Sequence, residues 1–101
     1  MAGWNRAAQL ATLTGTGQAG ALSIVTSAVR AMVGAAALVN RKTLQVYNNA
    51  GDVIYWAPNS TQCTSAAGFP IPVGASQTWT LTDSVEIWVV GSGNIRVAEM
   101  W

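Results

Sequence analysis

In the larger, C-terminal part of the chain, short runs of apolar and polar residues are separated by turn-forming residues at the spacing expected of a β-sandwich or barrel. Residues 43–47 place Leu44 and Val46 on one face of a strand. Residues 48–52 then supply asparagine, glycine and aspartate, which tolerate turn geometry. Residues 53–56 follow as a return strand, so these segments predict a β-hairpin.

Three further strands are predicted towards the C-terminus. Residues 77–82 alternate strictly, with Trp79 and Leu81 on the face that is expected to point into the core. Residues 85–90 and 95–101 follow, each after a group of turn-forming residues. The three segments predict an antiparallel meander.

The segment between the hairpin and the meander, residues 57–76, contains all three prolines of the chain and little periodicity. Proline has no backbone N–H and is therefore disfavoured inside a sheet. We predict a long ordered loop here, with a short extended piece at residues 69–73.

The alanine-rich segment at residues 21–39 is compatible with a helix, a pair of strands or a membrane span. Arg30 lies in its middle, which argues against a membrane-spanning helix because a charge in the bilayer is costly. Alanine and methionine favour a helix, whereas the β-branched valine, isoleucine and threonine residues favour extended structure. We predict one strand over residues 22–33.

Residues 1–20 are rich in glycine, threonine and alanine without strong periodicity, which predicts an extended N-terminal arm. No secretory signal is predicted, because the apolar run begins too late. The expected fold is therefore all-β: a small antiparallel β-sandwich or jelly-roll-like barrel formed by residues 21–101 as a single domain, with the arm attached.

The composition favours packing against other chains. Half of the 101 residues are hydrophobic and only 9% are charged, against about 25% in typical soluble domains. A chain this short buries roughly two-thirds of the surface that its unfolded form exposes, so assembly would cover the remaining apolar residues. The net charge of +1 comes without a clustered basic footprint, which disfavours nucleic-acid binding.

Side chains suited to catalysis or metal binding are scarce. The sequence has no histidine and one cysteine, Cys63, so the usual general base and the usual zinc or copper ligands are lacking. We predict no enzyme, no metal and no cofactor. A lone cysteine cannot form an intrachain disulfide, which favours intracellular synthesis. The spacing of Gly15, Gly17 and Gly20 matches the dinucleotide-binding fingerprint, but no hydrophobic strand precedes it.

The five tryptophans are the most distinctive chemical feature. The alternation of its strand assigns Trp79 to the core. Trp88 is expected to share a strand face with Glu86, and tryptophan is enriched at the hot spots of protein interfaces. The predicted protein interface combines the other four tryptophans with one basic residue, namely Trp4, Trp56, Trp88, Trp101 and Arg41.

Residues 40–49, NRKTLQVYNN, followed by DVIY at residues 52–55, resemble a class of small tailed-phage virion proteins. In those chains an N-R-x-x-L-x-aliphatic-x-N strand precedes a V-x-Y/W return strand. Residues 68–76, GFPIPVGAS, look like the G-x-P-aliphatic-x-x-G-x-S approach to the next strand, and residues 95–99 resemble the closing strand. The resemblance implies a compact β-sandwich or jelly-roll-like fold that serves as a capsid decoration protein, a head-fibre base or a tail component.

Together, composition and resemblance predict a structural component of a phage virion, synthesised in the host cytoplasm. It would assemble with copies of itself, as a trimer or a larger symmetric oligomer, and with the major capsid protein, without nucleic-acid or membrane partners. A tail or head-fibre accessory protein is one alternative. Another is a carbohydrate-binding or host-receptor module that uses residues 57–76 and exposed tryptophans.

Overall fold

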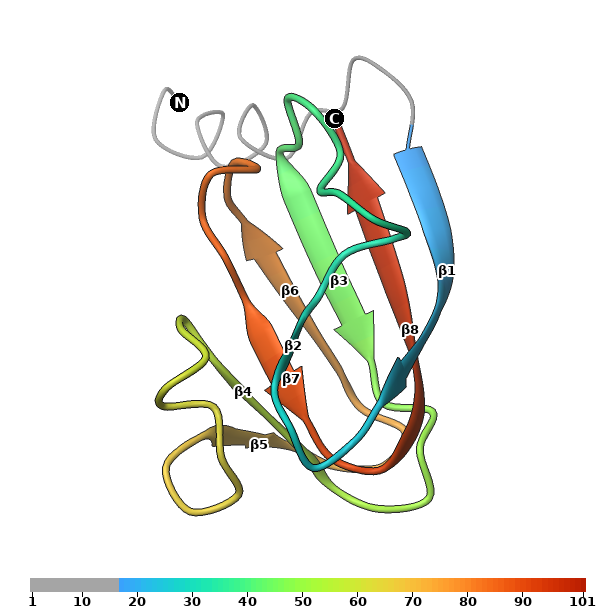
Figure 1. Ribbon diagram of the computed structural model, residues 1–101. Helices are drawn as coiled ribbons and strands as arrows, with labels where there is room; N and C mark the ends of the chain where they lie inside the picture. The colour runs from blue at the N-terminus through green and yellow to red at the C-terminus, as the bar shows by residue number, and fades with distance from the viewer. Residues whose placement is uncertain (1–16) are drawn as a thin grey trace, which may run out of the picture.

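A computed structural model describes residues 17–101 as an all-β fold of two four-stranded antiparallel sheets (Figure 1). The strands are β1 (Gly17–Ile24), β2 (Val29–Arg30), β3 (Thr43–Tyr47), β4 (Ile54–Ala57), β5 (Phe69–Ile71), β6 (Ser76–Thr80), β7 (Trp88–Val90) and β8 (Gly93–Met100). The two sheets pack face to face, which confirms the predicted small β-sandwich. Within residues 17–101 no helix is long and apolar enough to cross a membrane.

The chain crosses from one sheet to the other at almost every connection. Sheet A has the strand order β1-β8-β3-β6, and sheet B has the order β2-β7-β4-β5. The predicted hairpin is wrong, because β3 and β4 lie in different sheets. The predicted meander is also wrong, since β6 pairs with β3, β7 with β2 and β4, and β8 with β1 and β3. Turn-forming residues indicate that the chain reverses but not which sheet it enters next, and crossing lets both strands bury their apolar faces in one core.

The first strand begins and ends earlier than predicted. Residues 17–20, which the sequence assigned to the arm, form the first half of β1, and β1 pairs with β8 along its whole length. A glycine inside a strand costs only about 1 kcal/mol, which a full ladder of hydrogen bonds offsets. The predicted strand over residues 22–33 is interrupted at residues 25–28, and only Val29 and Arg30 continue as β2.

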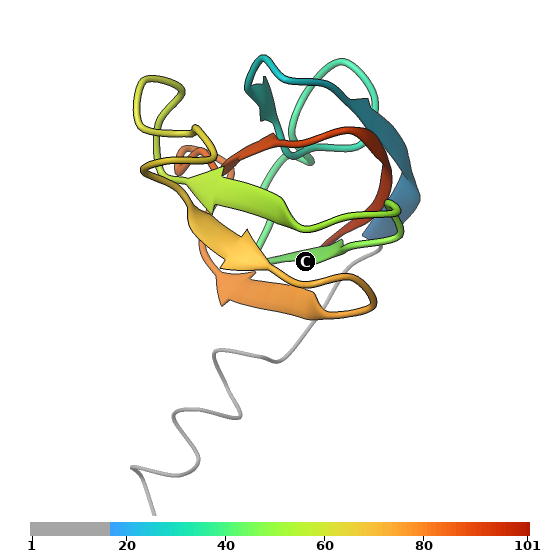
Figure 2. The same cartoon turned by 90° about the horizontal axis from the view of Figure 1, so that it is seen from below.

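The main core lies between the sheets. Its buried side chains are Ile24, Ala31, Leu44, Val46, Ala50, Ile54, Ile71, Ile87, Val89, Ile95 and Val97. Seen from below, the strands surround the space that these side chains fill (Figure 2). Trp79 packs against this core, as predicted, and its ring meets Trp56 edge-on with the ring centroids 5.0 Å apart. The two rings close the sandwich between the β5 and β6 edges.

A second, smaller apolar cluster lies on the outer face of sheet B. Its members are Ala57, Cys63 and Val90, with Ala28, Tyr55 and Trp88 partly buried around them. Cys63 belongs to the loop of residues 58–68, which lies over this face. The predicted extended piece at residues 69–73 is present as the short strand β5.

Candidate functional site

The carboxylate of Glu99, in the central strand β8, is the most extensively bonded side chain in the described part of the protein. Its side chain is fully buried. Oε1 accepts hydrogen bonds from Gln18 Nε2 at 3.0 Å and from the Val33 N–H at 2.9 Å. Oε2 accepts from the Leu38 N–H at 3.1 Å and from Arg41 Nη1 at 2.8 Å. This single group therefore fastens β1 and the loop between β2 and β3 to the centre of sheet A.

Arg41 is the ionic partner of Glu99, and only 1% of its surface is exposed. Asn40 precedes it with a φ of 62°, a left-handed conformation that asparagine tolerates better than most residues. Arg41 Nη2 donates to the carbonyl oxygens of Thr82 and Val85, both at 2.8 Å. The prediction of Arg41 as an interface residue is thus corrected: its guanidinium binds groups inside the fold.

The surroundings of Glu99 act on its pKa in opposite directions. Burial on its own would raise the pKa, because a carboxylate is less stable away from water. The hydrogen bonds from Val33, Gln18, Leu38 and Arg41 favour the ionised form and outweigh burial, so the pKa of Glu99 lies below its ordinary value. The carboxylate is therefore ionised in the folded protein at neutral pH.

We expect the free energy of unfolding to fall in acid because of this pKa. Glu99 has a lower pKa in the folded protein than in the unfolded chain, where a glutamate titrates at about 4.3, so proton uptake favours unfolding. The contribution is fully present above the unfolded pKa and is lost as pH falls through the folded pKa. Urea titrations between neutral pH and about pH 3 measure it. In Glu99→Gln this component should disappear, and an unchanged pH dependence in that variant would contradict the assignment.

Among the predicted interface tryptophans, Trp56 lies mainly in the interior of the sandwich. Trp4 lies outside the described residues. Trp56 packs against the main core, and its ring centroid lies 5.0 Å from those of both Phe69 and Trp79. Because β4 turns this ring towards the interior, Trp56 is chiefly a packing residue. Phe69 beside it is 56% exposed.

The other two tryptophans lie on different parts of the molecule. Trp88 is on the outer face of sheet B, where its Nε1 donates to Glu86 Oε1 at 2.9 Å. The two side chains meet, but β7 begins at Trp88, so Glu86 precedes the strand whose face it was predicted to share. Arg30 Nη1 lies 4.0 Å from the same carboxylate. Trp101 follows β8 and lines an open hollow of about 410 Å³ beside Lys42. The three predicted interface tryptophans within residues 17–101, namely Trp56, Trp88 and Trp101, therefore do not gather into one patch.

The outer face of sheet A is almost uncharged. Its outward-facing residues are Gly17, Ala19, Ala21, Ser23, Thr43, Gln45, Tyr47, Ser76, Thr78, Thr80, Asn94, Arg96, Ala98 and Met100. Arg96 is the single charged member. A shallow hollow of about 110 Å³ lies where Ala19 and Ala98 meet the larger side chains of Tyr47 and Arg96. Sequence reasoning missed this face, although the small residues at every second position of β1 were a usable signal.

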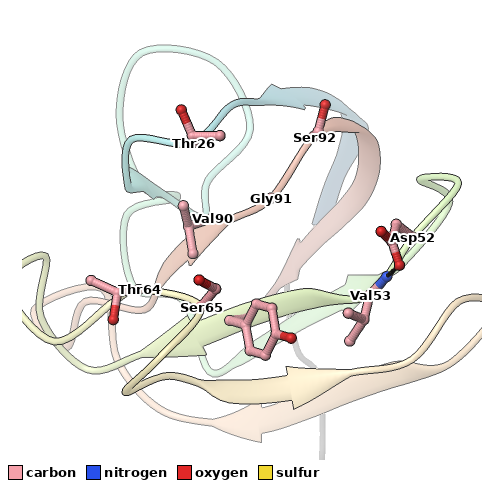
Figure 3. A pocket seen from close by; sticks show the side chains of 9 residues that line it. Thr26, Asp52, Val53, Thr64, Ser65, Val90, Gly91 and Ser92 are labelled. Atoms are coloured by element: carbon pink, nitrogen blue, oxygen red, sulfur yellow. Dashed lines mark hydrogen bonds between the residues drawn. The ribbon is translucent and has the colours of Figure 1, made fainter.

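A further hollow, of about 260 Å³, lies beside the loop that covers sheet B (Figure 3). The hydroxyl-bearing residues Thr26 and Ser92 line one side, and Thr64 and Ser65 line the other. Asp52 adds a carboxylate, which also accepts a hydrogen bond from the next backbone N–H. Separate segments of the chain therefore bring neutral hydroxyls and one acid to the same depression.

Cys63 and the glycines at positions 17 and 20 are the described residues whose chemistry the sequence singled out. Burial raises the pKa of the Cys63 thiol, the opposite of what activates a cysteine nucleophile. Within residues 17–101, no three histidine, cysteine, aspartate or glutamate side chains gather to hold a metal ion. Gly17 and Gly20 lie inside β1 without a following helix, so the dinucleotide fingerprint lacks its structural context.

The fold and these surfaces define a small all-β sandwich protein. Neither a protein-family model, nor a curated protein, nor a solved structure matches this chain. What its surfaces bind must therefore be inferred from their own chemistry.

Proposed function

We propose that the protein is a structural component of a phage virion, namely a capsid decoration or cement protein that assembles with copies of itself and binds the major capsid protein. The observation that carries the proposal is the outer face of sheet A, which bears one charged residue, Arg96. A tail or head-fibre accessory protein would use the same face. The phage setting comes from the sequence resemblance at residues 40–55 and 68–76.

The contrast between the two sheets supports a docking role for sheet A. A sheet face that stays in water normally carries charged and polar residues, whereas the buried centre of a protein interface is depleted in charge. On sheet B, the loop of residues 58–68 lies over part of the outer face, where Cys63 packs with Ala57 and Val90. Sheet A has no comparable cover among the described residues, and its small side chains allow a close approach by another protein surface.

Electron microscopy of virus particles tests the proposal. An antibody against the chain is expected to label particles purified from the cells that produce it, and light scattering of the purified chain is expected to show oligomers. A chain that is monomeric at high concentration and absent from particles would contradict the proposed virion role.

A matched pair of variants tests the face itself. Ala98→Lys places a charge at the centre of the outer face of sheet A, where the new ammonium group would have to be desolvated in an interface, and Gln62→Lys places the same charge on the exposed loop over sheet B. We expect Ala98→Lys to reduce incorporation into particles by about tenfold or more, equivalent to about 1.4 kcal/mol, and Gln62→Lys to leave it unchanged. Equal incorporation of the two variants would contradict docking through sheet A.

The hydroxyl-lined hollow favours a second candidate function, a carbohydrate-binding or host-receptor module. Thr26, Thr64, Ser65 and Ser92 supply donors and acceptors, and Asp52 supplies a strong acceptor, as binding of a neutral sugar requires. The predicted module uses exposed tryptophans, whereas the aromatic side chain that lines this hollow is Tyr55. A glycan array without a signal from the purified chain would remove this candidate.

A further inference from the structure

β1 is an edge strand of sheet A and is the outermost strand on its side of the molecule (Figure 1). It contains eight residues, GQAGALSI, with no charge and no proline. Its register with β8 runs one-to-one from end to end, so no bulge twists the edge away. Charges, prolines and bulges are the devices by which proteins prevent an edge strand from pairing with another chain. β1 has none of them.

The other three sheet edges are shorter, and two of them are better protected. β2 has only two residues, one of which is Arg30, and β5 has three residues with Pro70 at its centre. β6 has five residues, so it offers a shorter ladder than β1. β6 also lacks a charge, a proline and a bulge, so what distinguishes β1 is the length of its unprotected ladder, eight residues against five.

We infer that β1 pairs with β1 of a second copy of this chain, antiparallel and across a two-fold axis, so that two copies of sheet A form one continuous eight-stranded sheet. The inference rests on the self-association in the proposed function and names its contact. A second copy fits because an uncharged strand placed opposite itself brings no like charges together, and because the two ladders have equal length. Two-fold pairs are also the commonest symmetric assemblies.

The alternation along β1 restricts the register of this pairing. Its even-numbered residues face the core and its odd-numbered residues face outwards. An even-numbered residue of one copy must therefore pair with an even-numbered residue of the other, and an odd-numbered residue with an odd-numbered one. In any other register the core-facing side chains of one copy would lie on the outer face of the combined sheet. The registers that keep nearly the whole strand paired place the two-fold axis at Gly20 or at Ala21. The smallest expected assembly is thus a pair, and any larger ring would consist of pairs.

Opposite charges at Ala21 test this pairing in the full-length chain. Ala21→Lys and Ala21→Glu each place two like charges next to the axis, and each is expected to weaken association by about tenfold or more in sedimentation equilibrium. An equimolar mixture of the two variants is expected to form mixed pairs at least as tightly as the wild type. Thr78→Lys, on the same outer face but at the opposite edge, is expected to leave association unchanged.

The two charges also separate this contact from an effect within one chain. Arg96 is the register partner of Ala21 in β8, so it would stabilise a glutamate and destabilise a lysine at position 21. An effect on folding alone therefore has opposite signs in the two variants, whereas repulsion across the axis weakens association in both. Unfolding midpoints at low protein concentration, where pairs dissociate, verify that both variants fold.

Several outcomes would contradict the pairing of β1 with β1 and leave the proposed virion role intact. One is a wild-type oligomer that neither Ala21 variant weakens, and another is a monomeric chain that still labels particles. Weakening by Thr78→Lys as well would replace the two-fold contact with head-to-tail pairing of β1 and β6. A monomer that is also absent from particles would defeat both the pairing and the proposed function.

Discussion

Replacing Glu99 by alanine is expected to lower the free energy of unfolding by about 3–5 kcal/mol at neutral pH. The substitution leaves the buried guanidinium of Arg41 without its counter-charge at 2.8 Å. It also removes the acceptor from the N–H groups of Val33 and Leu38 and from the amide of Gln18. Urea unfolding followed by tryptophan fluorescence measures the change.

The matched control for this prediction is Glu86→Ala. Glu86 also has an arginine nearby, but its side chain is 48% exposed and the N···O distance to Arg30 is 4.0 Å. Exposed ion pairs contribute less than about 1 kcal/mol, so this variant should unfold close to the wild type. If the two variants lost the same stability, the buried carboxylate would not have the structural role assigned to it.

Replacing Asn48 by alanine is expected to cost about 2–4 kcal/mol, the second largest effect that we predict. Asn48 is fully buried, and its Nδ2 donates to the carbonyl oxygens of Asp52 and Ile71 at 2.9 and 2.8 Å. Its Oδ1 accepts from the Ala50 N–H at 2.9 Å. Alanine leaves these buried backbone groups without partners at the corner where the chain crosses from sheet A to sheet B.

The neighbouring residue provides the comparison. Asn49 has the same side chain in the same turn but is exposed. Asn49→Ala should therefore change the unfolding free energy by less than about 0.5 kcal/mol, and a large loss there would show that the turn depends on asparagine composition more than on the buried contacts of Asn48.

The sequence predicted best the features that depend on neighbouring residues. Strict alternation correctly placed Leu44, Val46 and Trp79 on inward faces, because side chains of a strand point to opposite sides in turn. The short extended piece predicted within residues 69–73, a segment without clear alternation, is present as β5, which contains Pro70.

The pairing of strands was beyond the reach of local patterns. Residues 48–52 have the composition of a hairpin turn, but the burial of Asn48 against Ile71 carries the chain to the other sheet. Arg41 and Glu99 are 58 positions apart, so nothing near either residue in the sequence indicated that they meet. The interface prediction for Arg41 failed for that reason: an arginine with a distant buried partner has the same local signature as one at the surface.

The almost uncharged outer face of sheet A could not be predicted for the same reason. Its rows combine Ala19, Ala98, Gln45 and Thr78 from four strands, and they form a surface only when the strand order is known. The interface prediction rested on the tryptophans instead. Of these, Trp56 packs with the core residue Trp79 between the two sheets.

The position of β8 between β1 and β3 has a consequence for how the chain folds. Gly17 pairs with Met100, so β1 gains its only partner strand within the described fold after a loop spanning almost the whole domain has closed. Such non-local pairing slows folding to roughly milliseconds to seconds. Throughout that interval an uncharged strand is available to other chains, and refolding at high concentration is therefore the step at which this protein is most prone to aggregate.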